Sequence, residues 1–174
     1  MKALTLWPEW AWAVSRLGKN VENRPRRTKM EPGTVFAIHA GASWGGSDTG
    51  YKRLDEVFAP VDETARRAGW RIGVHLARNV VQGYNINAPL TFEDSLFADV
   101  HTRAVVAVAR FGGLLEPGRD DPEKWPWWDQ QYHGYILSEI FVLPHAVASL
   151  GQQGFWNLKE VPEERVQRQI QGFV

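Results

Sequence analysis

Hydrophobic residues in the first forty positions predict a strand, a helix and a second strand. Residues 3–6 (ALTL) form a short apolar run that predicts a strand. Four apolar residues then recur at helical spacing: Trp7, Trp10, Val14 and Leu17. They predict an amphipathic helix over residues 8–17, because Pro8 suits a first helical turn and Gly18 suits a C-terminal cap. The near-continuous apolar run of residues 34–40 predicts a strand buried on both faces.

The rest of the chain adds further short strands and fewer helices. We expect strands at residues 21–24, 104–110, 135–142 and 154–158, and a proline- and tryptophan-rich loop at residues 114–129. Helical spacing within residues 45–98 predicts a helical insert. Trp12 lies outside the apolar face of the first helix, and we expect it to pack against this insert. A C-terminal helix is expected at about 162–173, opened by Pro162. The pattern predicts one α+β domain over residues 1–174: a small mixed β-barrel of about five or six strands flanked by helices.

Composition narrows the class of protein. The 174 residues contain no cysteine, which excludes disulfides, thiolate metal sites and a cysteine nucleophile. The longest apolar run has six residues, so we expect no membrane span. Trp7, Pro8 and Glu9 interrupt the place of a signal-peptide core, so we expect a cytoplasmic protein.

The net charge is zero, but residues 16–29 hold six basic groups and one acidic group. This basic window predicts a site for a polyanion. The alternative is a solvated loop paired with the acidic second half of the chain. The tryptophans at 125, 127 and 128 have two interpretations as well: they stack on bases, or they plug one end of the barrel. The five histidines lack metal-ligand spacing, and the glycine-rich residues 41–50 lack a phosphate-loop ending, so we expect no metal and no cofactor.

Five ordered pieces of the sequence resemble the ASCH domain, a branch of the PUA-like superfamily. They are the helical Trp10, the G-K-x-x-E-x-R segment of residues 18–24, Ile38-His39-Ala40, the strand AVVAVAR, and the run from YHGYILSEIFVLPHAV to GQQGFW. The resemblance covers about residues 3–40 and 102–158. It implies a β-barrel with a cleft beside residues 18–24, in a superfamily associated with RNA and modified bases. Some small relatives are acetylcytidine amidohydrolases, and ribonuclease activity is reported in the family. Here Glu22 stands where those amidohydrolases have threonine.

The residues expected to bind a nucleic acid are Lys19, Glu22, Arg24, Arg26, Arg27, Lys29, His39, Tyr132 and His133. Lys19 follows a helix end and is expected to present a free ammonium, and Arg24 to offer a planar fork. Glu22, beside two cations, is expected to accept hydrogen bonds from a base or to act as a base, unless it only pairs with Arg24.

Three functions stay open. The first is binding of RNA, single-stranded nucleic acid or a modified nucleoside, favoured by the basic window. The second is a small hydrolase, either a ribonuclease or a modified-nucleoside amidohydrolase, that uses Lys19 and Glu22 as catalytic residues. The third is a protein-interaction domain, for which the sequence indicates no particular partner.

Overall fold

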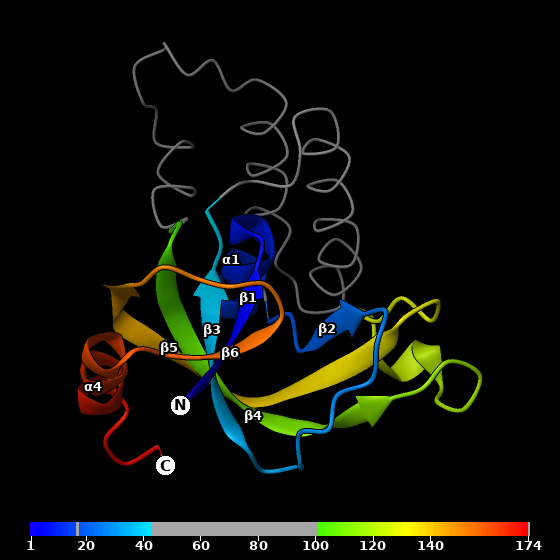
Figure 1. Ribbon diagram of the computed structural model, residues 1–174. Coiled ribbons are helices and arrows are strands. Elements are labelled where there is room, and N and C mark those ends of the chain that lie inside the picture. The colour runs from blue at the N-terminus through cyan, green and yellow to red at the C-terminus, as the bar shows by residue number, and fades with distance from the viewer. Residues whose placement is uncertain (17, 43–100, 174) are drawn as a thin grey trace, which may run out of the picture.

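Six strands form one mixed sheet in the computed structural model, which describes residues 1–16, 18–42 and 101–173 (Figure 1). The strands are β1 (Lys2–Leu6), β2 (Val21–Arg24), β3 (Val35–Ala40), β4 (Ala104–Leu115), β5 (His133–Ala148) and β6 (Phe155–Asn157). Their order across the sheet is β2-β5-β4-β3-β1-β6. β1 and β3 are parallel, and the other neighbours are antiparallel. β2 and β6 remain as edges, so the sheet is a half-barrel rather than a closed barrel.

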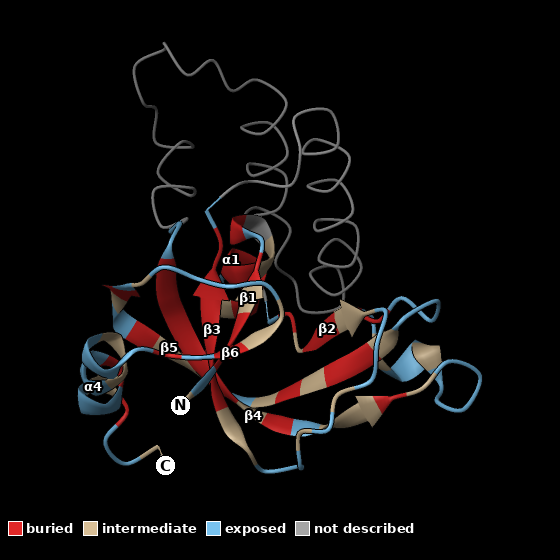
Figure 2. Ribbon diagram, viewed as in Figure 1, coloured by how far each residue is buried: buried red, intermediate tan, exposed pale blue. Residues whose placement is uncertain are grey.

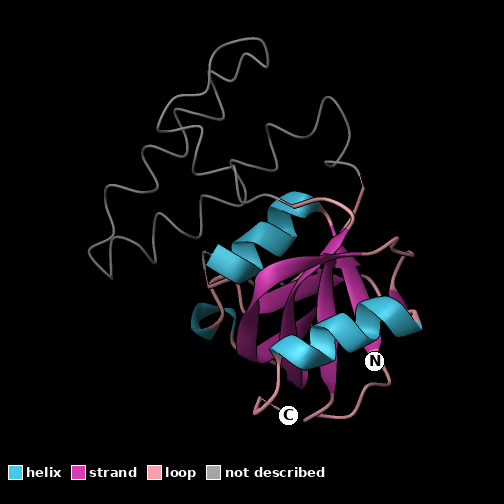
Figure 3. Cartoon of the chain, turned by 90° about the vertical axis from the view of Figure 1, so that its left-hand side faces the viewer, coloured by secondary structure: helices cyan, strands magenta, loops and turns pink. Residues whose placement is uncertain are grey.

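Two helices cover opposite faces of this sheet (Figure 3). Ala11 and Val14 of α1 (Pro8–Arg16) pack in one buried cluster with Phe36 and Ile38 of β3. The intervening Ala37 belongs to a second cluster, which includes Val166 of α4 (Glu160–Gln169) and Ile170, the residue that follows this helix. Successive side chains of a strand point to opposite faces. The apolar run of β3 is therefore buried on both sides, and the first half of the neighbouring β4 is buried as well (Figure 2).

The α+β class and the expected strands are confirmed, with differences in length. β4 continues to Leu115 and β5 extends from His133 to Ala148, so the first two residues of the expected loop 114–129 are strand. A short 3-10 helix, η2 (Pro122–Lys124), lies within that loop. α4 begins at Glu160, two residues before Pro162, and ends at Gln169. Phe173 lies beyond the helix, where its ring packs 5.5 Å from that of Phe141.

The predicted insert of residues 45–98 lies outside the described residues, and so does its expected contact with Trp12. The single-domain prediction for residues 1–174 therefore stays a prediction. Within the described part of the chain, no helix is long and apolar enough to cross a membrane.

Candidate functional site

The turn that follows α1 directs the side chain of Lys19 into the protein. Gly18 has a φ of +68°, a left-handed conformation that glycine adopts without steric cost, and it ends the helix. The backbone N–H of Lys19 donates to Ala13 O at 3.1 Å. The lysine side chain is consequently turned into the protein and is only 2% exposed, so the expectation of a free ammonium is wrong.

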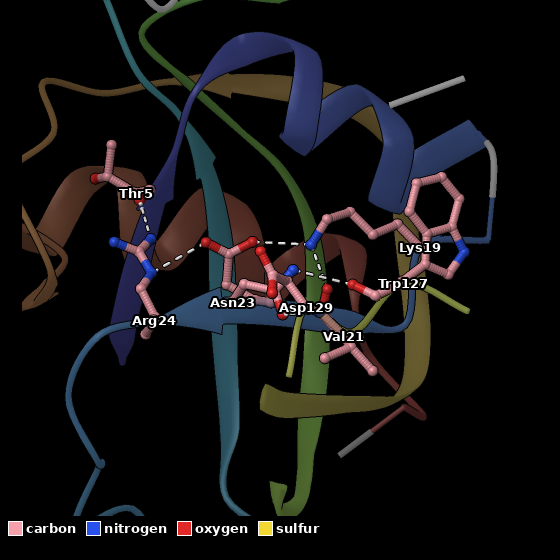
Figure 4. A network of polar contacts seen from close by, with 8 residues as sticks. Thr5, Lys19, Val21, Asn23, Arg24, Trp127 and Asp129 are labelled. Carbon is pink, nitrogen blue, oxygen red and sulfur yellow. Dashed lines mark hydrogen bonds and ion pairs between the residues drawn. The ribbon is translucent and has the colours of Figure 1, made fainter. Parts of the chain in front are cut away.

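Lys19, which precedes β2, forms a continuous ionic network with Glu22 and Arg24 on that strand (Figure 4). Lys19 Nζ lies 2.9 Å from Glu22 Oε2 and also donates to Val21 O. Glu22 and Arg24 are two residues apart on a strand, so their side chains share a face. Arg24 Nε lies 3.0 Å from Glu22 Oε1, but it is not aligned for a hydrogen bond, so the contact is an ion pair. Arg24 Nη2 donates to Thr5 O on β1 at 2.8 Å.

The environment of Lys19 changes its affinity for a proton. Burial lowers the pKa of the Lys19 ammonium, and the neighbouring Glu22 carboxylate opposes that shift. The ammonium also lies 5.3 Å from the centre of the Trp10 ring, which partly compensates a buried cation. Lys19 is therefore held as one member of a buried pair.

A second hydrogen-bonded chain begins at Thr5. Trp156 Nε1 donates to Thr5 Oγ1 at 2.9 Å, and Thr5 Oγ1 lies 3.2 Å from His39 Nδ1. His39 Nε2 lies 2.9 Å from Ser149 O. A carbonyl can only accept, so Nε2 carries the ring proton and Nδ1 accepts from the threonine hydroxyl. Burial lowers the pKa of His39, which keeps the imidazole neutral.

The ionic network and the hydrogen-bonded series that begins at Thr5 border the same cleft, which has a volume of about 1030 Å³. Thr5, Lys19, Glu22, Arg24 and His39 contribute to its floor. The loop of residues 126–132 supplies one wall, and the loop of residues 150–153 supplies another. Gly151 is required where it stands, because a Cβ there would overlap the imidazole ring of His39.

The 126–132 wall is fastened to β2. Asn23 Nδ2 donates to Trp127 O at 2.9 Å, and Asn23 Oδ1 accepts from the backbone N–H of Asp129 at 3.0 Å (Figure 4). Trp127 and Trp128 pack with Val21 in a buried cluster. Of the two interpretations of these tryptophans, the packing role is the one the structure supports, although both rings border the cleft.

The rim of the cleft is unusually apolar. The described residues include four large exposed hydrophobic side chains: Trp7, Tyr132, Leu150 and Val161. The first three line the cleft, and only Val161 lies elsewhere. Exposed aromatic groups beside a polar floor are typical of sites that bind a ring with a polar edge.

Four residues that the sequence analysis expected to bind nucleic acid lie outside the cleft lining: His133, Arg26, Arg27 and Lys29. His133 pairs with Arg24 in the β2–β5 register, and its Nδ1 is buried without a hydrogen-bond partner among the described residues. Arg26, Arg27 and Lys29 are exposed in the segment that follows β2. Arg27 Nη2 is 2.5 Å from Glu116 Oε1, so this part of the basic window pairs with the acidic half of the chain.

Several lining residues were not expected from the sequence. Thr5, Trp7 and Leu150 carry no motif, and their positions near the cleft follow only from strand pairing and the loop after β5. Among the described residues, no group of three or more histidine, aspartate or glutamate side chains could hold a metal ion.

Among known proteins, similarity to this chain is found in the fold and not in the sequence. No family profile and no curated protein sequence matches the chain. The structure is similar to that of an ASCH protein from Zymomonas mobilis at 11% identity, with a TM-score of 0.49, over 96% of this chain and 93% of that one. A tyrosine-to-phenylalanine mutant of that protein is similar at 12% identity and a TM-score of 0.48, over 96% of both chains. The fold of this chain is thus similar to that of an ASCH protein, and no site residue is transferred from it.

Proposed function

We propose that this protein binds nucleic acid, either RNA or another single strand, and that its cleft takes one nucleotide, including one with a modified base. One observation carries the proposal: a fixed polar floor and an exposed aromatic rim meet in a single cleft. Aromatic rings stack on any base face, and polar groups at the floor contact a base edge. The cleft volume is at the upper end of that of small-molecule sites.

The segment after β2 supports the same function. Pro25 lines the cleft, and Arg26, Arg27 and Lys29 follow it at the protein surface. Exposed cations beside the cleft suit the phosphates on either side of a bound nucleotide. Because Arg27 is paired with Glu116, Lys29 is the better candidate for such a contact.

The buried Lys19–Glu22 pair favours a second function, hydrolysis of RNA or of a modified nucleoside. A lysine whose pKa is lowered by burial can exchange a proton nearer neutral pH than an ordinary lysine. In a hydrolase of this kind, Glu22 would be the group that exchanges the proton with Lys19.

Binding is tested with labelled RNA, single-stranded DNA and duplex DNA of one sequence, by fluorescence anisotropy at two salt concentrations. We expect saturable binding of the single strands and weaker binding of the duplex. Lys29→Ala should weaken binding of all sequences equally and reduce the salt slope by about one unit. Arg168→Ala, on α4, is the matched control and should change neither.

The same samples separate the other functions. If the unmodified protein binds none of these nucleic acids at low salt, the nucleic-acid proposal is rejected and a protein-interaction domain remains. Mass spectrometry of RNA and of acetylated nucleosides after incubation tests the hydrolase. Shortened RNA or a deacetylated product, lost in Lys19→Met, would establish that second function.

A further inference from the structure

The three charged side chains of the ionic network differ in how far they are exposed to solvent. The side chains of Lys19, Glu22 and Arg24 are 2%, 10% and 24% exposed, respectively. Glu22 is nearly covered, and each of its oxygens already faces a cation of the protein. Arg24 is therefore the member of the network that a ligand in the cleft can reach.

The guanidinium of Arg24 is held in a fixed plane. Its Nε is buried beside Glu22, and its Nη2 donates to Thr5 O. An arginine has five N–H donors in a planar fork. Among the described residues, no partner is found for Nη1, and the guanidinium nitrogen that makes neither contact points away from both partners (Figure 4). Within the described part of the chain, the donors without a partner are thus the two of Nη1 and the second one of Nη2.

A fork that presents only donors requires a ligand edge that presents acceptors. A phosphate would satisfy this condition, but the Glu22 carboxylate lies 3.0 Å from Arg24 and Asp129 also lines the cleft. These negative charges repel the anionic phosphodiester of a nucleic acid and do not repel a neutral base. The edge that fits is one with two adjacent neutral acceptors.

We infer that Arg24 determines base preference in the cleft by donating to two adjacent acceptors of a nucleobase, namely N7 and O6 of guanine or N3 and O2 of cytosine. The inference rests on the proposed function. Adenine and uracil have no such pair, because a donor stands between or beside their acceptors. Glu22 and Thr5 act as positioning residues that hold the guanidinium in its plane.

The inference is tested with labelled uridine hexamers in which one central position is A, C, G or U. We expect the hexamer with C or the one with G to bind about tenfold more tightly than those with A or U, the scale of a bidentate base contact. Arg24→Lys keeps the charge but loses the fork. It should remove this preference and leave the salt slope unchanged. Arg168→Lys, an exposed arginine on α4, is the control.

A second measurement needs no variant and therefore does not depend on the folding of Arg24→Lys. Hexamers with 7-deazaguanine or 3-deazacytosine lack one acceptor of the pair, and the unmodified protein should lose its preference for whichever base it selects. This result also distinguishes guanine from cytosine.

Three results overturn the inference while leaving the proposed function intact: equal binding of all four hexamers, preference for A or U, or full affinity for the deaza bases. A base preference that survives in Arg24→Lys would show that the planar fork does not select the base, and would overturn the inference too. If none of the hexamers binds, the proposed function itself fails.

Discussion

His39 is a buried imidazole whose two ring nitrogens are both used by neighbours. Nε2 donates to Ser149 O, and Nδ1 accepts from Thr5. A protonated ring would place a second N–H against the threonine oxygen, which already accepts from Trp156. Neutral His39 is therefore part of what holds β1, β3 and the loop after β5 together.

This arrangement predicts a loss of stability in acid. The folded pKa of His39 lies below 6.5, so the unfolded chain binds its proton at a higher pH than the folded one. The contribution of neutral His39 is fully present above about pH 6.5 and is lost as the pH falls toward the folded pKa. In His39→Gln, the side-chain amide can donate to Ser149 and accept from Thr5 without titrating. We expect its unfolding free energy to fall less steeply between about pH 7 and 5.

Urea unfolding at several pH values measures this difference. His145→Gln, at an exposed position on β5, is the control and should keep the slope of the unmodified protein. An unchanged slope in His39→Gln would show that His39 is not the group responsible.

The resemblance of residues 18–24 to the ASCH motif singled out Lys19, Glu22 and Arg24, and the structure joins their side chains in one ionic network. The resemblance did not predict that Lys19 is buried. That burial depends on α1, Trp10 and the tryptophans of a loop more than one hundred residues later, and no local pattern encodes their position. For the same reason Thr5 appeared only as one residue of a strand.

At the scale of elements, β2 is the edge strand that connects the floor of the cleft to its wall. Val21 and Asn23 face the loop of residues 126–132, whereas Glu22 and Arg24 face the floor. The wall therefore depends on two hydrogen bonds from one asparagine side chain.

Asn23→Ala should loosen this wall. We expect a loss of about 1 kcal/mol in unfolding free energy, the usual scale for such bonds. Faster hydrogen exchange of the Asp129 amide should accompany it, because its acceptor is removed. Ser138→Ala removes a side-chain hydrogen bond to Arg110 O and is the control. It should destabilise the protein without changing exchange at Asp129. Equal exchange at Asp129 in all three proteins would contradict the role of Asn23.

The elements themselves were predictable where the chain is uniformly apolar. β3 and the first half of β4 match the expected residues to within one position, because a nearly unbroken apolar run of six or seven residues has few alternatives. The far ends of β4 and β5 were not predictable, since glycine and proline residues such as Gly112, Gly113 and Pro144 usually interrupt a strand. In the structure the two strands continue past these residues with register shifts, one of them between Phe111 and Gly113. Pairing between distant strands overrides the local signal there.

At the scale of the whole molecule, the sheet is covered by α1 on one face and α4 on the other, and the cleft opens beside β1 and β2. The charge asymmetry of the sequence is partly neutralised by folding. Arg27 and Arg119 both pair with Glu116, and Lys19 and Arg24 share Glu22. Folding thus pairs Lys19, Arg24 and Arg27 of the basic window with carboxylates, which favours recognition of a base over capture of a phosphate chain.

The cleft is the proposed binding site, and a comparison of two exposed hydrophobic side chains tests this proposal. Tyr132 lines the cleft and is 41% exposed, whereas Val161 on α4 is 57% exposed and lies outside it. Affinity for a single-stranded RNA hexamer is measured for Tyr132→Ala, Val161→Ala and the unmodified protein. We predict a loss of about 1–3 kcal/mol for Tyr132→Ala, the scale of one base–aromatic stack, and none for Val161→Ala. Equal affinity of all three folded proteins would show that the cleft is not the binding site.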